Sequence, residues 1–456
     1  MIDLFRIVLP FVLLLYFVVK GIKSPLFFLG IPFLMFMRES IFFMNIKLFI
    51  IPGKLGLILG FIWLVLLWIL FSIIRIYKKP DKMYNTLPIN ALDYCIIGLM
   101  ILTGIGLGTA IINYSLLAGV VKEFVNLFSL LAGFFIIKNW ASYNKPEVLE
   151  NFLLSLIIVN SIAAFLFILH QGLHFKIYLQ EEYLKEIFNG QEVTRSMWFM
   201  PQFLFLSIAF SLIQMKKNPL FYSVLLTLNL IATIITYFRS FSIIAVCLFI
   251  IYSILIGIKK GRLWLAVRNI LLYCLTGVIF FMVISKVFPT NTEYILNRFS
   301  EITNPQSAKG PNNLDIRFMM SRNVITNIED NKIILGMGAV TENQTYWAIL
   351  MKQALADMVW TGVIFRWGLV GTILFILLFI FSLFKAFNLF MKSEGVVSNL
   401  ALLILLYLFS QIIESFIDWI FMSEHGFATG LWYFAILSLI LGYKKNEIPP
   451  ERDPIS

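Results

Sequence analysis

Long runs of apolar residues are the feature that most constrains the fold of this chain. A bilayer core about 30 Å thick needs roughly 20 apolar residues in helical form, because an open backbone cannot satisfy its hydrogen bonds there. Such runs lie at residues 55–74, 91–112, 117–137, 152–169, 220–238, 241–256, 270–288, 359–384, 400–417 and 427–441, and three shorter ones lie at 4–19, 25–37 and 203–213. The sequence therefore predicts an all-α polytopic membrane protein with about 12 or 13 spans.

Composition excludes the competing classes of chain. Of the 456 residues, 60% are hydrophobic and only 13% are charged, whereas soluble domains average about 45–50% apolar and about 25% charged residues. A soluble domain and a disordered chain are both excluded, because neither tolerates this much apolar surface. The three cysteines, Cys95, Cys247 and Cys274, lie inside apolar runs. They predict core positions rather than a disulfide framework or a zinc site.

The basic residues orient the spans, because short cytoplasmic loops carry the excess of lysine and arginine. The predicted inner loops and tail contain Arg75, Lys78, Lys79, Lys82, Lys138, Lys145, Lys216, Lys217, Lys259, Lys260, Arg262, Arg268, Lys385, Lys392, Lys444 and Lys445. The C-terminus is therefore predicted in the cytoplasm. A net charge of +11 spread over loop ends in this way does not form a nucleic-acid-binding patch.

Two polar segments are predicted to face outward, at residues 171–201 and 289–357. The second is the only domain-like insertion, and we expect it to cap a cavity. The predicted organisation is an N-terminal transmembrane part (1–288), an extracytoplasmic loop (289–358), a C-terminal transmembrane part (359–443) and a cytoplasmic tail (444–456).

The usual signatures of soluble enzymes are absent: there is no P-loop, no HExxH and no GxSxG. The glycines Gly104, Gly106 and Gly108 lie in the middle of a span without a preceding strand, so they predict close helix packing rather than a dinucleotide loop. His170 and His174 are four residues apart, but no third ligand is placed beside them. No metal and no cofactor are predicted.

Charges near the outer face are more informative, because an unpaired ion within the membrane costs at least about 2.5 kcal/mol. Arg239 interrupts two apolar runs with almost no loop between them. Other outer charges are Asp315, Arg317 and Arg322, which precede Gly336-Met337-Gly338, and Asp357, which opens the next span. The alternatives are a headgroup anchor for Arg239, surface ion pairs for the loop charges and a helix cap for Asp357.

Taken together, these elements resemble the O-antigen polymerase and ligase superfamily. The resemblance consists of an arginine in a tight outer turn (Arg239), then Arg317 followed by Gly336-x-Gly338 in a long outer loop, then Asp357 ahead of Gly368-x-x-Gly371. It covers the topology of nearly the whole chain, although each motif is short. Ligases typically have a histidine where Asp357 stands, and the spacing from Arg317 to Gly336 is about one residue longer, which favours the polymerase.

The resemblance implies a membrane glycosyltransferase of the GT-C type in the bacterial cytoplasmic (inner) membrane, with its active site on the extracytoplasmic side. The implied donor and acceptor are undecaprenyl-diphosphate-linked glycans, with membrane lipid and a chain-length regulator as further partners. Arg239, Arg317 and Arg322 would bind the diphosphate in place of a metal, since arginine makes bidentate contacts with phosphate. Asp357 would be the general base, and Gly336 and Gly338 would shape the loop.

Other function classes stay open at this point. An O-antigen ligase or another lipid-linked glycan transferase would use the same residues. A lipid-linked glycan flippase or a secondary transporter would line a central pathway with its intramembrane charges, but transporters usually show internal repeats, and none is clear here. A structural membrane protein would not need clustered outer arginines.

Overall fold

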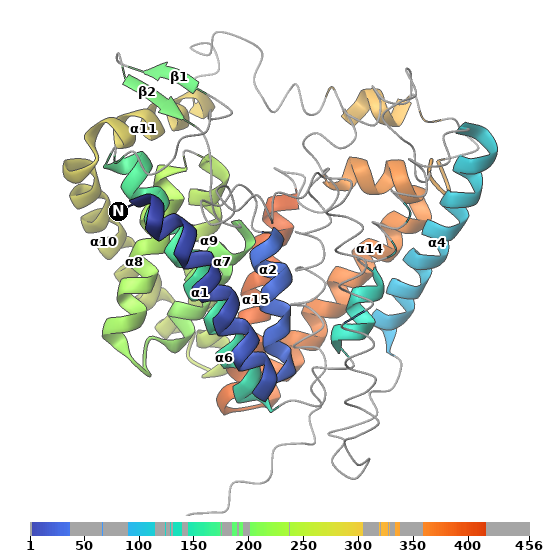
Figure 1. Ribbon diagram of the computed structural model, residues 1–456, viewed down its shortest axis with the longest axis horizontal. Helices are drawn as coiled ribbons and strands as arrows, with labels where there is room; N and C mark the ends of the chain where they lie inside the picture. Colours follow the sequence, from blue (N-terminus) through green and yellow to red (C-terminus); the bar gives the residue numbers. More distant parts are fainter. Residues whose placement is uncertain are drawn as a thin grey trace, which may run out of the picture. The chain divides into compact units, whose positions relative to one another are not determined.

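The computed structural model describes much of the helical framework of the chain. The described residues are 2–36, 66, 90–114, 124, 128, 131–138, 145–173, 175, 185–188, 191–194, 201–236, 238–303, 319, 321–326, 328, 333–337 and 359–415. Their elements are α1 (Ile2–Lys23), η1 (Pro25–Leu29), α2 (Gly30–Phe36), α4 (Ala91–Tyr114), α6 (Pro146–Phe167), η3 (Ile168–Gly172), β1 (Lys185–Phe188), β2 (Gln191–Thr194), α7 (Pro201–Gln214), α8 (Pro219–Ile235), α9 (Arg239–Lys259), α10 (Leu263–Val287), α11 (Pro289–Thr303), α14 (Val359–Lys392) and α15 (Gly395–Ser415). Helices dominate this part of the chain (Figure 1).

Six helices in these ranges are long and apolar enough to cross a bilayer. They cover Ala91–Thr109, Pro146–Gly172, Ser240–Lys259, Leu263–Val287, Trp360–Lys392 and Gly395–Ser415. These six helices confirm the prediction that the chain is a helical membrane protein. The total of about 12 or 13 spans stays a prediction, because expected runs such as 55–74 and 427–441 lie almost wholly outside the described residues.

Several helices are longer than their apolar runs. Helix α10 begins at Leu263 rather than at residue 270, and α14 continues to Lys392 rather than ending at residue 384. Charged side chains such as Arg268 and Lys385 lie in these extensions. A helix keeps its backbone hydrogen bonds beyond the hydrocarbon core, and long basic side chains can reach the headgroups from there. The apolar runs thus mark the spans but underestimate the helices.

A small β-hairpin is an exception to the all-α prediction. Strands β1 and β2 pair antiparallel, with Glu186 opposite Val193 and Ile187 opposite Glu192. The sequence between them is Asn189-Gly190, which is the strongest short-range signal for a two-residue hairpin turn. The predicted outer segment 171–201 therefore contains local structure that this dipeptide could have revealed.

The chain forms two compact units. Unit 1 comprises residues 1–50, 152–313 and 409–414, and unit 2 comprises residues 51–151, 314–408 and 415–456.

Helix α7 is the core of unit 1. Its side chains from Phe203 to Phe210 are all buried, on every face of the helix, and it packs against α8 and α9. The ring of Phe205 meets that of Phe241 in α9 edge to face, with 5.4 Å between centroids. A helix that is apolar all round is one that other helices surround.

Three polar side chains connect the helices of unit 1 inside this apolar core. Asn229 Nδ2 in α8 donates to Ser161 Oγ in α6 at 3.0 Å, and the hydroxyls of Ser161 and Ser207 in α7 lie 3.3 Å apart. All three side chains are buried. Each such bond between membrane helices contributes about 0.6–2 kcal/mol, so the network fixes how α6, α7 and α8 pack.

In unit 2, α4 packs along α14. Trp367 Nε1 in α14 donates to Thr103 Oγ1 in α4 at 3.0 Å, and Gly98 leaves room for Leu374. Of the three glycines predicted to pack closely, Gly106 is buried, whereas no atom of the described residues lies within 4 Å of where the Cβ atoms of Gly104 and Gly108 would be. Both glycines are on the exposed side of α4, whereas Gly98, where a Cβ would lie 2.7 Å from the Leu374 side chain, is at the packed position.

Candidate functional site

The structure places only part of the predicted site. Arg317, Gly338 and Asp357 lie outside the described residues. Arg239 belongs to unit 1, where its backbone is described, and Gly336 belongs to unit 2. The exposed side chain of Arg322 also belongs to unit 2. The described residues of the predicted site thus belong to two different units.

Arg239 is the first residue of α9. The residue before it, Phe238, has an extended backbone (φ −85°, ψ 109°) and supplies no side-chain cap, and the first turn contains no acidic residue. The N-terminus of a helix carries a partial positive charge, so a basic residue there is unfavourable by about 0.3–1 kcal/mol. Both the helix end and the residue type favour an anion at this position.

A π-helical turn lies beside the end of α8 in unit 1. This turn, η3, continues α6 and packs against α8. A Cβ on Gly172 would lie 2.8 Å from a ring carbon of Phe288 and 2.9 Å from the Ile235 side chain. The ends of α6, α8 and α10 therefore converge at Gly172, and Arg239 follows Ile235 by four residues in the sequence.

In unit 2, the predicted outer loop is joined to α14 by a backbone clasp, formed by residues 333–337 and 365–370. Met337 N–H donates to Phe365 O at 2.7 Å, while Leu369 and Val370 N–H donate to Ile333 O and Ile334 O at 2.9 and 3.2 Å. The carbonyls of the loop thus accept from backbone N–H groups that lie just after a break in α14.

Two glycines make this clasp possible. Gly368 has φ 63° and ψ −162°, a non-helical conformation that breaks α14, and Gly336 has φ 80°. A Cβ on Gly368 would lie 2.3 Å from Ile334 O, and one on Gly336 would lie 2.4 Å from Arg366 O. The first glycine of the predicted Gly-x-Gly and the first of the predicted Gly-x-x-Gly therefore touch each other's segments. Only residues without a side chain fit there.

A second contact links the predicted outer loop to the start of α14. Thr361 Oγ1 donates to Ser321 Oγ at 2.8 Å, and Ser321 precedes the exposed Arg322 on a short helical stretch, residues 321–326. Arg322 and Gly336 are thus held near the first turns of α14. By the charge rule this end of α14 is the predicted outer end.

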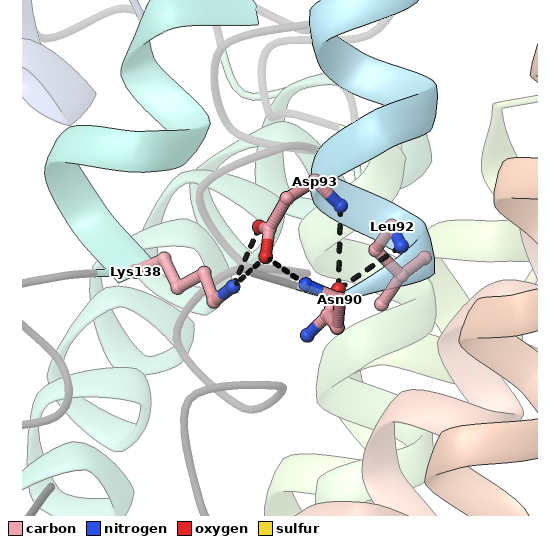
Figure 2. A network of polar contacts seen from close by, with 4 residues as sticks. All are labelled: Asn90, Leu92, Asp93 and Lys138. Carbon is pink, nitrogen blue, oxygen red and sulfur yellow. Dashed lines mark hydrogen bonds and ion pairs between the residues drawn. The ribbon is translucent and has the colours of Figure 1, made fainter. Parts of the chain in front are cut away.

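A different charged cluster is buried at the start of α4 (Figure 2). Asn90 Oδ1 accepts from the N–H groups of Leu92 and Asp93 at 3.0 and 3.2 Å, and Asp93 Oδ2 accepts from Asn90 N–H at 2.8 Å. This reciprocal arrangement is a capping box. Lys138 Nζ donates to both carboxylate oxygens of Asp93, at 2.5 and 2.6 Å.

The buried pair gives Lys138 a partner that the sequence did not indicate. Lys138 lies at the end of the helical residues 131–138, is only 5% exposed and is bound to Asp93, 2% exposed, while its place on the inner side stays a prediction. Such a pair is costly to break, because one buried charge is left uncompensated. We assign the cluster a structural role, since it ties the start of α4 to the helical residues 131–138.

We expect Asn90→Ala to lower the free energy of unfolding by about 1 kcal/mol, because α4 loses the acceptor that caps its first turn. Thermal unfolding of the purified protein in detergent would measure the change. Asn90→Ser is the control, since serine caps a helix as well as asparagine. Equal losses for serine and alanine would show that capping is not what Asn90 contributes.

Two ionisable residues to which the sequence assigned no role are buried in the structure. Arg366, 4% exposed, lies in α14 beside the clasp, and Glu414, 1% exposed, lies near the end of α15. Gln411 Nε2 donates to Glu414 Oε2 at 3.0 Å. Their signal was a charge inside an apolar run, which marks a candidate functional site in a membrane helix. No group of three potential metal ligands occurs within the described residues.

Comparison with known protein families finds no family model that matches this chain, and no curated protein matches it significantly. Function is therefore inferred from the residues themselves, above all from the start of α9 in unit 1 and the backbone clasp in unit 2.

Proposed function

We propose that this chain is a polymerase that joins undecaprenyl-diphosphate-linked oligosaccharide repeat units into O-antigen or a related surface polysaccharide of the lipopolysaccharide type. The reaction would take place on the outer face of the bacterial cytoplasmic membrane. The enzyme would be a metal-independent glycosyltransferase of the GT-C type. The observation that carries the proposal is Arg239 at the uncapped start of α9.

A diphosphate bound at the start of α9 would explain why an arginine stands there. Arginine at the positive end of a helix is unfavourable alone, but it becomes favourable when both it and the backbone N–H groups face a bound anion. Permanently charged guanidinium groups can take the place of a divalent cation at a departing diphosphate. In this proposal Arg239 and Arg317 bind the diphosphate, and Arg322 assists them.

The proposed transfer needs no cofactor, because the donor is already activated on its lipid. A hydroxyl oxygen of the acceptor glycan bonds to the anomeric carbon of the donor, and its proton passes to the carboxylate of Asp357. The bond from that carbon to the diphosphate oxygen breaks, and the electron pair leaves with undecaprenyl diphosphate. The arginines stabilise the charge that develops there.

The backbone clasp supports a role for the outer loop in this reaction. It holds residues 333–337 against α14 through main-chain atoms, and residues 321–326 are held at the start of the same helix through Ser321 and Thr361. Loop residues anchored on a rigid element in this way can carry catalytic groups in a fixed geometry. The resemblance implied a loop-shaping role for Gly336, and its φ of 80° supports that part of the proposal.

Reconstitution tests this proposal. The purified protein in detergent, mixed with undecaprenyl-diphosphate-linked single repeat units and a metal chelator, should yield a ladder of longer lipid-linked glycans and free undecaprenyl diphosphate. Asp357→Asn should leave the single units unchanged at a normal protein level, because an amide caps a helix but cannot take a proton. Gel electrophoresis of the glycans would measure both results.

Three outcomes would contradict the proposal. Transfer of finished glycan to a lipid core, without chain growth, would indicate a ligase. Movement of the lipid-linked unit across vesicle membranes, without formation of a glycosidic bond, would indicate a transporter. Full activity of Asp357→Asn would reduce Asp357 to a helix cap.

A further inference from the structure

The break in α14 lies well inside the predicted span of this helix. Helix α14 begins at Val359 and is broken at Gly368, so nine residues, about 13 Å, separate its predicted outer end from the break. On the other side, 17 residues, about 25 Å, separate the break from Lys385, the first charged residue after it. With a hydrocarbon core about 30 Å thick, the first count puts Gly368 about 13 Å below the outer edge of the core, and the second puts it about 5 Å below.

The neighbouring helix gives a second measure of this depth. Trp367 Nε1, next to the break, donates to Thr103 Oγ1, and Thr103 lies near the middle of the 24-residue helix α4. A Cβ on Gly371, one turn further along α14, would lie 3.4 Å from the Leu102 side chain. The break in α14 is therefore level with the middle of another predicted span, within the hydrocarbon core.

Residues 333–337 of the predicted outer loop lie at the same depth, because they are bonded to both sides of the break. Their backbone is not helical, and non-helical backbone inside a membrane needs partners for its polar groups. The clasp supplies such partners: Leu369 and Val370 N–H donate to loop carbonyls, and Phe365 O accepts from Met337 N–H. Bonding between main chains is thus what a loop segment inside the membrane requires.

The exposed side chains at this level are large and apolar. Ile334 is 54% exposed and Leu335 is 42% exposed. Leu369 and Ile373, which follow the break in α14, are exposed as well, whereas the ionisable side chain of Arg366 is buried. Charged side chains within a membrane face the protein interior. The apolar side chains of the loop segment and of α14 thus share a surface that faces lipid.

We propose that residues 333–337 form a re-entrant segment, which enters the membrane from the predicted outer side and contacts the hydrocarbon chains of outer-leaflet lipids through Ile334 and Leu335. The chain then returns to the same side, because α14 begins there. The occupant of this surface is lipid, since the surface lies at the depth of the hydrocarbon core and continues the lipid-facing side of α14. The inference does not depend on the proposed function, because it uses only helix lengths, contacts and exposure.

Spin labels on single cysteines would test the depth of the segment. A nitroxide is attached at Ile334→Cys or at Leu335→Cys, and the full-length protein is reconstituted into phosphatidylcholine vesicles. Power saturation then compares collisions with oxygen, which concentrates in hydrocarbon, with collisions with a water-soluble nickel chelate. In every variant the natural cysteines are replaced by alanine: Cys95, Cys247 and Cys274.

Two further positions serve as references. Ile105→Cys is the lipid reference, because Ile105 is exposed on α4 two residues after Thr103. Lys260→Cys is the water reference, because Lys260 is exposed at the end of α9, in the short turn before α10. We expect the ratio of oxygen to nickel collisions at Ile334→Cys and Leu335→Cys to be within about twofold of the lipid reference and at least about fivefold above the water reference, because hydrocarbon excludes polar solutes.

A ratio closer to that of Lys260→Cys than to that of Ile105→Cys, at either loop position, would overturn the inference. It would show that the segment lies in water, outside the membrane or in a water-filled cavity. Size-exclusion profiles would confirm that the labelled variants are folded. Both loop side chains are exposed, so a label fits at either position, and the second variant decides the result if the first does not fold.

Discussion

Gly368→Ala should leave little folded protein, with a loss of unfolding free energy of about 3 kcal/mol or more. Its backbone conformation, φ 63° and ψ −162°, is one that residues with a side chain rarely adopt. The new Cβ would also lie 2.3 Å from Ile334 O and 2.5 Å from Gly336 N. These are main-chain atoms, so they cannot rotate away as a side chain could. Relief of the clash would require the clasp to open.

Size-exclusion profiles and thermal unfolding in detergent would measure this effect. Gly104→Ala is the matched control, because Gly104 lies in α4 with nothing within 4 Å of the new Cβ. There the substitution should be neutral or should stabilise the helix by up to about 1 kcal/mol. If Gly368→Ala were as stable as Gly104→Ala, the clasp would not be a firm part of the fold.

Arg239→Ala should abolish most polymer, with a fall of about 100-fold or more in the rate of bond formation, while the protein still inserts normally. The reason is the loss of a bidentate cation where the diphosphate leaves. Arg239→Lys should recover only a small part of the rate, because lysine offers a point charge without the planar fork. Accumulation of single repeat units on the lipid carrier would be the readout in cells.

Arg262→Ala provides the matched control for Arg239. Arg262 is also an arginine at a helix start, the N-cap of α10, where it makes no side-chain cap, but the charge rule predicts it on the inner side. Its removal should leave polymer length unchanged. Wild-type polymer in the Arg239→Ala strain, or equal losses from both substitutions, would argue against a diphosphate site at the start of α9.

The sequence predicted a membrane-spanning helix correctly where a long apolar run was enough to identify it. Helices α4 and α9 contain the predicted runs, because hydrocarbon thickness sets a minimum length for each of them. The ends of α10 and α14 were missed, because a helix continues past the membrane without any change in its hydrogen bonding. One local signal was overlooked, because the dipeptide Asn189-Gly190 is typical of a two-residue turn and could have predicted the β-hairpin.

Contacts between distant residues could not be predicted in the same way. Asp93 and Lys138 are 45 residues apart in the sequence, and their pairing depends on how two helices pack. The motif glycines Gly336 and Gly368 were singled out by resemblance, but the resemblance did not indicate that each one makes room for the other's backbone. The roles of Arg317 and Asp357 stay predictions, because these residues lie outside the described ranges.

Helix α7 has a consequence for how the protein is made. Its 14 residues rise only about 21 Å at 1.5 Å per residue, less than the hydrocarbon core of about 30 Å. Its side chains also face other helices rather than lipid. On its own, a segment of this length would be poorly retained by a bilayer during synthesis. We therefore expect α7 to depend on the later arrival of α8 and α9 for stable insertion, so that a chain truncated after Lys217 is degraded faster than one truncated after Lys260.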